Sequence, residues 1–279
     1  MVGSNAQGKT SLLEAVYYLA TFVSFHATND RQLINFIAGR EPLAVARIVA
    51  DFIHSNSRNF PESPITHNGK HRLEVRLIQE SNGYTGQPRL RKEILLDGVK
   101  CKMGEAIGTF NAVLFLPQMM RVIEGSPEER RRYMNLAMGQ TVPKFAHYLT
   151  EYSHILSQRN ALLKNLNERG GNPDELDYWD NGLADSGTWL IYERIKAIRQ
   201  LERLAARVHS DLTRSAEILR LAYDPAYDPL PQPKAQFALP MDTALDRSSI
   251  SFDAIREGFI DQSKQLRNLE IARGVTTIG

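Results

Sequence analysis

A glycine-rich octapeptide near the start of the sequence constrains the chain more than any other feature. Residues 3–10, Gly-Ser-Asn-Ala-Gln-Gly-Lys-Thr, match the phosphate-loop pattern G-x-x-x-x-G-K-[ST] in full. Glycines let backbone N–H groups approach phosphate oxygens, the lysine contacts the β- and γ-phosphates, and the threonine hydroxyl ligates Mg²⁺. The pattern predicts a nucleoside-triphosphate site with Thr10 as a Mg²⁺ ligand. Its residues are Gly3, Ser4, Asn5, Ala6, Gln7, Gly8, Lys9, Thr10 and Ser11.

The residues after this loop predict a helix, because the apolar side chains between Leu12 and Ala20 recur at helical spacing. The N-terminal dipole of such a helix favours a bound anion. The alternative interpretation is a glycine-rich helix start with a surface lysine. Only Met1 and Val2 precede Gly3, whereas the strand that carries a phosphate loop needs about five residues. We therefore expect a fragment, or a start codon assigned too late.

Composition excludes several other classes of protein. The 279 residues carry a net charge of +2, which is too balanced for a polybasic protein. The single cysteine, Cys101, excludes an internal disulfide and a cysteine-based zinc cluster. No apolar run approaches the ~20 residues that span a bilayer, and no signal pattern opens the chain. We expect a soluble cytoplasmic protein of about two domains.

The first part of the chain has the patterns of strands. Residues 43–53 are rich in Ala, Val and Ile, and apolar residues alternate with charged ones around Val75. Residues 91–96 predict another strand, and Asp97-Gly98 predicts a hairpin turn after it. The continuous apolar run 112–116 before Pro117 predicts a buried strand. Residues 54–70 predict a loop.

The second part has the patterns of helices. Ser126, Pro127 and Glu129 form the sequence of a capping box with proline at the first helical position. A second helix is expected from near Pro143 to Gly170-Gly171.

The rest of the chain continues this helical pattern. Residues 176–212 carry an apolar stripe of about ten turns, interrupted only near Gly182 and Gly187. Residues 222–248 predict a long loop, residues 252–272 another helix, and residues 275–278 the start of a strand.

Segments distributed along the whole chain match, in order, the motifs of one bacterial family. They are residues 3–15, 24–26, 113–117, 124–133, 158–164, the stretch from Trp179, and 272–276. On these segments the chain resembles the RecF family of recombination-repair ATPases, which is related to the ABC and structural-maintenance-of-chromosomes ATPases. The resemblance implies an α/β fold, namely an ABC-type P-loop ATPase lobe with an inserted α-helical arm domain. We assign residues 1–118 to a partial ATPase lobe, 119–270 to the arm and 271–279 to the start of a return strand.

The resemblance also implies a function. It implies binding of ATP and Mg²⁺, ATP-dependent homodimerisation, and binding to duplex DNA next to single-stranded gaps. It further implies work with RecO and RecR in loading the recombinase, with a part in the SOS response.

Two elements of the family are absent from this sequence. The nearest match to a Walker B strand is residues 94–97, but Gly98 favours a hairpin there. Gly139-Gln140 lacks the rest of an ABC signature. We therefore expect a RecF fragment without the first strand and the catalytic C-terminal part, with severely impaired hydrolysis.

Other candidate residues have alternative interpretations. Arg130, Arg131 and Arg132 either contact DNA phosphates or form a solvated helix face, and they diverge by about 100° each. Gln118 resembles a glutamine that senses Mg²⁺, but it is also an ordinary residue at a strand end. Residues 186–221 hold seven basic and four acidic residues, which supports a DNA-facing arm only weakly.

Two other functions remain open at this point. One is a small-molecule kinase or generic P-loop NTPase, which the phosphate loop alone does not distinguish from a DNA-repair ATPase. The other is an inert truncated product.

Overall fold

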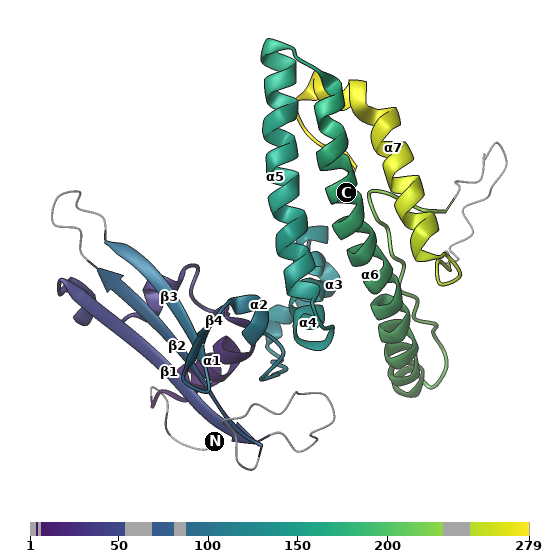
Figure 1. Ribbon diagram of the computed structural model, residues 1–279. Helices are drawn as coiled ribbons and strands as arrows, with labels where there is room; N and C mark the ends of the chain where they lie inside the picture. The colour runs from purple at the N-terminus through teal and green to yellow at the C-terminus, as the bar shows by residue number, and fades with distance from the viewer. Residues whose placement is uncertain (1–3, 5–6, 54–68, 81–87, 231–245, 279) are drawn as a thin grey trace. The chain divides into compact units, whose positions relative to one another are not determined.

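The computed structural model describes residues 4, 7–53, 69–80, 88–230 and 246–278. The chain divides into two compact units, Met1–Ala146 and His147–Gly279, which are described separately below (Figure 1). Among the helices in these described ranges, none is long and apolar enough to cross a membrane.

The first unit is built on an antiparallel sheet with the strand order β1-β2-β3-β4. The strands are β1 (Leu43–Ile53), β2 (Lys70–Glu80), β3 (Arg89–Leu96) and β4 (Val99–Cys101). In the central strand β2, the alternating residues Leu73, Val75 and Leu77 are buried, because they point to the one face that the unit covers. The strands predicted from the alternating pattern are confirmed.

The predicted hairpin at Asp97-Gly98 is also confirmed. Both residues have positive φ, 52° and 83°, which is the geometry of a two-residue turn between twisted strands. The Asp97 carboxylate accepts a hydrogen bond from the backbone N–H of Arg72 at 2.8 Å and lies 2.9 Å from His71 Nδ1. The carboxylate therefore holds the end of the sheet, which supports the turn interpretation of residues 94–98 over a Walker B strand.

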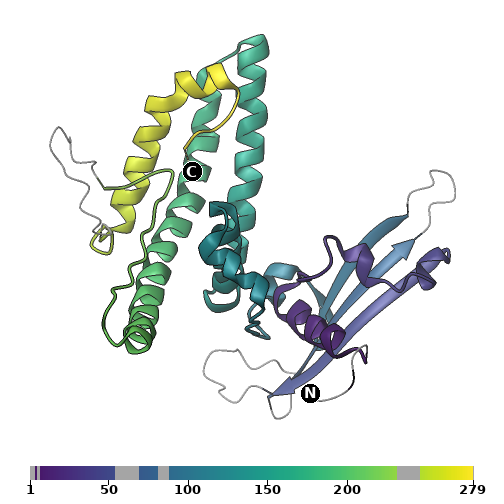
Figure 2. The ribbon, with the colours of Figure 1, turned by 180° about the vertical axis from the view of Figure 1, so that it is seen from behind.

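Helix α1 (Lys9–Thr21) packs on the covered face of the sheet (Figure 2). Its C-terminal half provides Tyr18 and Leu19, and Phe22 follows it, in one core with the buried β2 residues. The N-terminal half of α1 has an exposed apolar face formed by Leu12, Leu13 and Val16. The helix predicted after the phosphate loop is therefore confirmed, with only its far end buried.

The prediction of a buried strand over residues 112–116 is wrong. These residues are in no strand, and the side chains of Val113 and Phe115 are 99% and 80% exposed. The Ala112 N–H donates to Gln140 Oε1 at 2.9 Å. A strand needs a neighbour for its backbone hydrogen bonds, and no strand among the described residues pairs with this run.

Short helices complete the first unit, and one of them contains the predicted capping box. They are η1 (Asp30–Leu33), η2 (Ala38–Arg40), α2 (Met103–Ala106), η3 (Pro117–Met120), α3 (Arg121–Glu124) and α4 (Pro127–Thr141). The Ser126 hydroxyl accepts from the Glu129 N–H, and the Glu129 carboxylate accepts from the Ser126 N–H. These two bonds satisfy backbone donors that the helix start leaves without partners.

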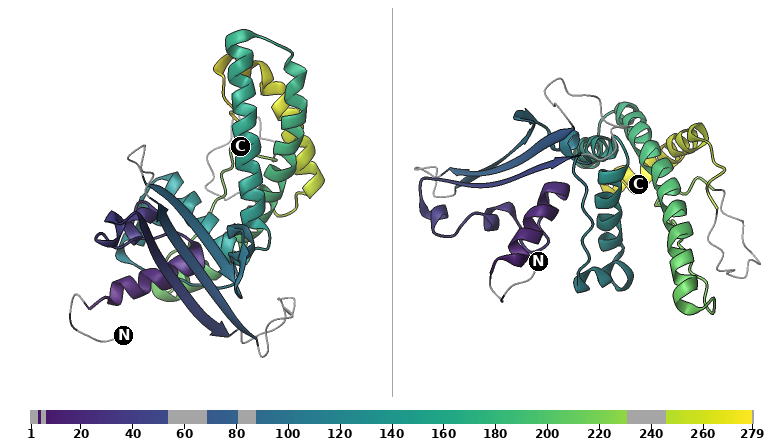
Figure 3. Two further views of the ribbon diagram at one scale, coloured as in Figure 1. Left: turned by 60° about the vertical axis from the view of Figure 1, so that its left-hand side comes forward. Right: turned by 90° about the horizontal axis from the view of Figure 1, so that it is seen from below.

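In the described residues, long helices make up most of the second unit (Figure 3). They are α5 (Phe145–Arg169), α6 (Leu176–Thr213) and α7 (Phe252–Arg273), with the short helix η4 (Pro173–Glu175) before α6. Gly170 and Gly171, with φ of 72° and 143°, reverse the chain between α5 and α6. Leu183 and Ile191 from α6 and Ile255 and Phe259 from α7 are among the buried residues of its core. The predicted helices are confirmed.

The segment after α7 is not the strand that the sequence predicts. Residues 275–278 are irregular, because polar side chains rather than a neighbouring strand bind their backbone. The N–H groups of Thr277 and Ile278 donate to the Glu270 carboxylate, and the Thr276 N–H donates to Asn160.

Candidate nucleotide-binding site

The residue before α1 has a backbone conformation that favours the second glycine of the predicted phosphate loop. Gly8, the residue before the helix, has a left-handed conformation with φ 75°. No atom lies within 4 Å of where a Cβ would be, so the conformation and not crowding favours glycine. The first N–H groups of a helix have no acceptor within the helix and can bind an anion. Among the predicted residues, Gly3, Asn5 and Ala6 lie outside the described part of the chain.

The predicted side chains are gathered at this same helix end. Lys9 is the first residue of α1, and its ammonium group donates to the Ser4 carbonyl oxygen. Thr10 and Ser11 follow in the first turn and are exposed, as are Ser4, Gln7 and Gly8. The Ser4 contact shows that the Lys9 side chain turns back toward the residues before the helix.

A partly buried polar cluster fixes the other end of α1. The Tyr18 hydroxyl donates to Asp30 Oδ1 at 2.9 Å, and the Lys92 ammonium lies 2.7 Å from Asp30 Oδ2. Lys92 also donates to the Phe22 carbonyl oxygen at 3.0 Å. Burial and the neighbouring Asp30 carboxylate both raise the pKa of Tyr18, so the phenol stays protonated and donates. This cluster holds α1 against β3 and fixes the direction in which its N-terminus points.

A second polar contact ties the middle of α1 to the segment after it. The Ser24 hydroxyl donates to the Glu14 carboxylate. The Ser24 oxygen also accepts from the N–H groups of His26 at 2.9 Å and Ala27 at 2.7 Å. The turn at residues 24–27 is therefore fixed to the helix that carries the predicted site.

The oxygen donors at the start of α1 fit Mg²⁺ only if a nucleotide supplies most of the metal ligands. The Thr10 hydroxyl is exposed at the start of α1 and would be one protein ligand of the metal. In the described part of the chain, no group of three or more His, Cys, Asp or Glu side chains is placed to hold a metal ion. Mg²⁺ is commonly held by phosphate oxygens and water with one or two protein ligands. The predicted second ligand, Gln118, lies in η3 and not at the end of a strand.

The three arginines predicted to contact DNA lie in α4, and all three are exposed. Arg130 Nη1 donates to the Gly125 carbonyl oxygen at 2.8 Å, so this side chain folds back on the helix start. The charge of Arg132 lowers the pKa of Tyr17, although burial of the phenol has the larger and opposite effect. Arg132 therefore lies near α1.

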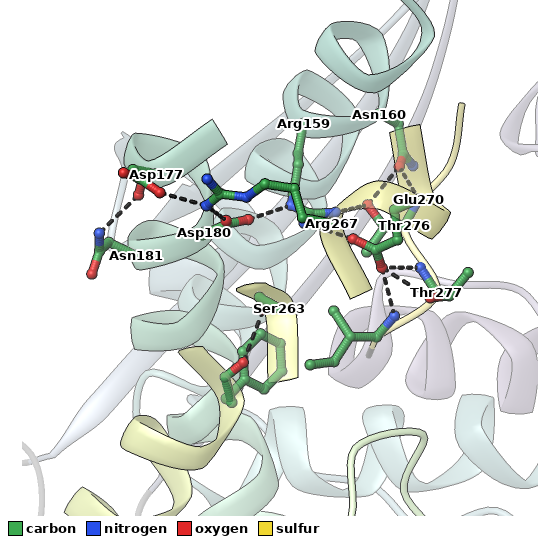
Figure 4. Close-up of polar contacts among 12 residues, drawn as sticks. Arg159, Asn160, Asp177, Asp180, Asn181, Ser263, Arg267, Glu270, Thr276 and Thr277 are labelled. Carbon is green, nitrogen blue, oxygen red and sulfur yellow. Dashed lines mark hydrogen bonds and ion pairs between the residues drawn. The ribbon is translucent and has the colours of Figure 1, made fainter. Parts of the chain in front are cut away.

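An extensive polar network lies in the second unit, where the sequence predicts no site (Figure 4). Arg159 from α5 is fully buried, with Nε 2.7 Å from Asp180 of α6 and Nη2 2.7 Å from Glu270 of α7. Arg159 Nη1 donates to the Thr276 hydroxyl at 2.8 Å. One guanidinium thus joins all three helices and the segment after α7.

A second arginine extends this network toward the surface. Arg267 of α7 donates to Asp180 Oδ2 at 2.8 Å and to the Asp177 carboxylate. Burial alone would raise the pKa of the Glu270 carboxyl, but the Thr277 amide and the Arg159 guanidinium hold it below its usual range. Glu270 is therefore a buried carboxylate that stays ionised.

Sequence periodicity does not reveal this network. Arg159 lies in a helix whose apolar stripe suggests only core packing, and Asp180 and Glu270 look like ordinary helix charges. The feature that would reveal the network is that all three charged residues occupy buried positions in their helices. These positions can be recognised only when it is known which face of each helix is buried.

The comparisons with known proteins find relatives over the whole chain, although no family model matches. The chain is 30% identical over 279 residues to the DNA replication and repair protein RecF of Alkaliphilus oremlandii. It is 33% identical over 285 residues to that of Herpetosiphon aurantiacus and 34% identical over 287 residues to that of Chloroflexus aggregans. These matches cover 99–100% of this chain, and the chain spans about 64% of the length of the first two relatives and 66% of the third.

Two solved structures have the same fold. They are described as the recombination mediator protein RecF with ATP and with ATPrS in the RecFOR pathway. Their TM-scores are 0.69 and 0.68, each at 22% identity over 99% of this chain, and the chain covers 62% and 63% of theirs. The predicted fold class, an α/β lobe with a helical arm, is confirmed by these neighbours.

Proposed function

Because the chain belongs to the RecF family of DNA replication and repair proteins, we propose that it binds ATP with Mg²⁺ at residues 3–11. The observation that carries this proposal is the start of α1. There a left-handed Gly8, the Lys9 ammonium and the exposed Thr10 hydroxyl meet at a helix N-terminus. In this arrangement Lys9 contacts the β- and γ-phosphates, the first-turn amides bind the phosphate oxygens, and Thr10 ligates the metal.

The family also indicates the process in which the bound nucleotide is used. We propose that the protein acts in the cytoplasm on duplex DNA next to single-stranded gaps, together with RecO and RecR, as an ATP-dependent homodimer. The exposed arginines of α4 supply positive charge for such a partner. In this proposal the ATPase lobe comprises residues 1–118 and the arm comprises residues 119–270.

Titration of the full chain with labelled ATP and Mg²⁺ tests the nucleotide site. We expect Lys9→Ala to weaken ATP binding about tenfold or more, because a charge-assisted contact to phosphate is lost. Lys264→Ala, an exposed lysine of α7, is the matched control and should bind ATP like the wild type. Equal affinity of the wild type and Lys9→Ala would refute the site, and no saturable binding by the wild type would favour the inert product.

A mobility-shift assay with gapped and intact duplexes distinguishes a DNA-repair ATPase from a small-molecule kinase. We expect tighter binding to the gapped duplex, and an affinity that falls as salt rises from about 50 to 200 mM. A kinase of small-molecule metabolism would bind neither duplex in this salt range.

A further inference from the structure

The C-terminal half of α6 carries a surface that the proposed nucleotide and DNA functions do not use. In Figures 1 and 2 these last turns of α6 extend beyond the end of α7. Two stripes of exposed side chains run along this part of the helix. The basic stripe is Arg199, Arg203 and Arg207, and the apolar stripe is Leu201, Leu204, Val208 and Leu212.

The basic stripe has little compensation from its own chain. Its three arginines are spaced four residues apart and therefore lie along one side of the helix. Within the described part of the chain, Arg203 and Arg207 form no ion pair. Arg199 lies near Asp246, whose pKa is lowered mainly by the hydrogen bond from Ser248 and also by the Arg199 charge.

The apolar stripe is exposed to a degree unusual for its residue types. The exposed fractions are 52% for Leu204, 58% for Val208 and 80% for Leu212. At 100° per residue, Arg207 lies about 60° from Leu204 around the helix axis, so the two stripes adjoin. The buried side of α6, marked by Ile191 and Ile195, faces a different direction.

The combination of the two stripes identifies the kind of partner. Contact with DNA phosphates would pair the arginines but leave the leucines against a polar backbone, since protein–DNA interfaces are polar and strongly charged. Protein interfaces instead bury an apolar centre with arginine enriched beside it. Between residues 196 and 212 the helix has four cations and two carboxylates, so the complementary surface is acidic.

We propose that residues 196–212 of α6 dock an acidic amphipathic helix of a partner protein. Its carboxylates, spaced four residues apart, pair with Arg199, Arg203 and Arg207, and its apolar face covers Leu204, Val208 and Leu212. The surface is about 25 Å long at 1.5 Å per residue, which accommodates a partner helix of between four and five turns.

A designed peptide tests the proposal on the full chain. The probe is a fluorescein-labelled 16-residue peptide with glutamate at every fourth position and leucine on the adjacent face. Anisotropy should show saturable binding that a scrambled peptide of the same composition lacks. The double variants Arg203→Glu/Arg207→Glu and Leu204→Ser/Val208→Ser should each raise the Kd about tenfold, since each removes one of the two contacts.

Control variants keep the same chemistry at other places in the second unit. Arg169→Glu reverses an exposed arginine at the end of α5, and Tyr178→Ser removes an apolar side chain that is 76% exposed. Both should bind the peptide within about twofold of the wild type. Circular dichroism confirms that each variant is folded.

Three results would overturn the proposal. The first is absence of saturable peptide binding, or binding that neither double variant weakens. The second is binding of a 20-bp duplex that the arginine pair controls while the Leu204/Val208 pair has no effect, which assigns the surface to DNA. The third is a dimer in sedimentation that Leu204→Ser/Val208→Ser converts to a monomer, which assigns it to a second copy of this chain. ATP binding by Lys9 is measured separately, so failure here leaves that site untouched.

Discussion

At the scale of single residues, the buried charged groups of the second unit carry a large free-energy cost of desolvation. Arg159 and Glu270 are fully buried, and Asp180 is 2% exposed. Removing such charges from water costs several kcal/mol for each ion. The cost is offset only because each charge has several partners at 2.5–3.2 Å, including backbone N–H groups that bind Glu270. The network therefore makes the packing of α5, α6 and α7 specific, and it is sensitive to the loss of any member.

We expect Glu270→Gln to lower the free energy of unfolding of the second unit by about 3 kcal/mol. The amide keeps the shape of the side chain but leaves the buried Arg159 with one carboxylate instead of two. Chemical denaturation followed by fluorescence measures the loss. Glu257→Gln, an exposed carboxylate of the same helix, should change the stability by less than about 0.5 kcal/mol.

The difference between the wild type and Glu270→Gln should depend on pH. The pKa of Glu270 is lowered in the folded state, so its contribution is complete above the usual glutamate pKa of about 4.5. The contribution is then lost as the pH falls through the folded-state pKa. Denaturation curves at neutral pH and at progressively lower pH below 4.5 should show the two proteins converging. A constant difference over this range would exclude an ionised Glu270.

At the scale of elements, two glycines explain how a 38-residue helix packs so closely. Gly182 and Gly187 interrupt the apolar stripe in the sequence, yet α6 is continuous through both. A Cβ at Gly187 would lie 3.1 Å from the ring of Tyr152 and 3.4 Å from that of Phe259. A Cβ at Gly182 would lie 3.2 Å from the terminal methyl of Ile155. The glycines are places where α5 and α7 approach the backbone of α6.

We expect Gly187→Ala to be more destabilising than Gly182→Ala by about 1 kcal/mol. Alanine improves helix propensity equally at both positions. At Gly187 the new methyl group meets two rings held in the core, whereas at Gly182 it meets a methyl group that can rotate away. Thermal denaturation of both variants measures the order. Equal stability of the two would show that the rings also adjust.

At the scale of the whole molecule, the two units have separate hydrophobic cores. The first core joins α1 to the sheet, and the second joins α5, α6 and α7. Both tryptophans of the chain, Trp179 and Trp189, lie in the second unit, and Trp189 stacks on Tyr148 with ring centroids 4.3 Å apart. Tryptophan fluorescence therefore reports the second unit alone.

This separation predicts different effects for two matched core variants. Leu77→Ala and Leu183→Ala remove the same atoms from positions that are 1% and 0% exposed, and each should cost about 2–5 kcal/mol. We expect only Leu183→Ala to shift the tryptophan transition, while Leu77→Ala shifts the loss of sheet signal in circular dichroism. A shift of the tryptophan transition by Leu77→Ala would show that the units unfold together.

The amino-acid sequence predicts those features that depend on neighbours along the chain. The phosphate-loop pattern, the alternation in β1 to β3, the Asp97-Gly98 turn and the capping box at Ser126 all follow from local chemistry. They were predictable because a backbone conformation and a helix or strand period are encoded within a few residues.

Contacts between side chains that are far apart in the sequence could not be predicted from the sequence. Residues 112–116 have the composition of a buried strand, but burial requires a neighbouring strand that none of the described residues supplies. Arg159 and Thr276 are 117 residues apart in sequence and form one hydrogen bond. Such pairings depend on how whole helix faces pack, because the free energy of a buried charge is set by its surroundings and not by its sequence neighbours.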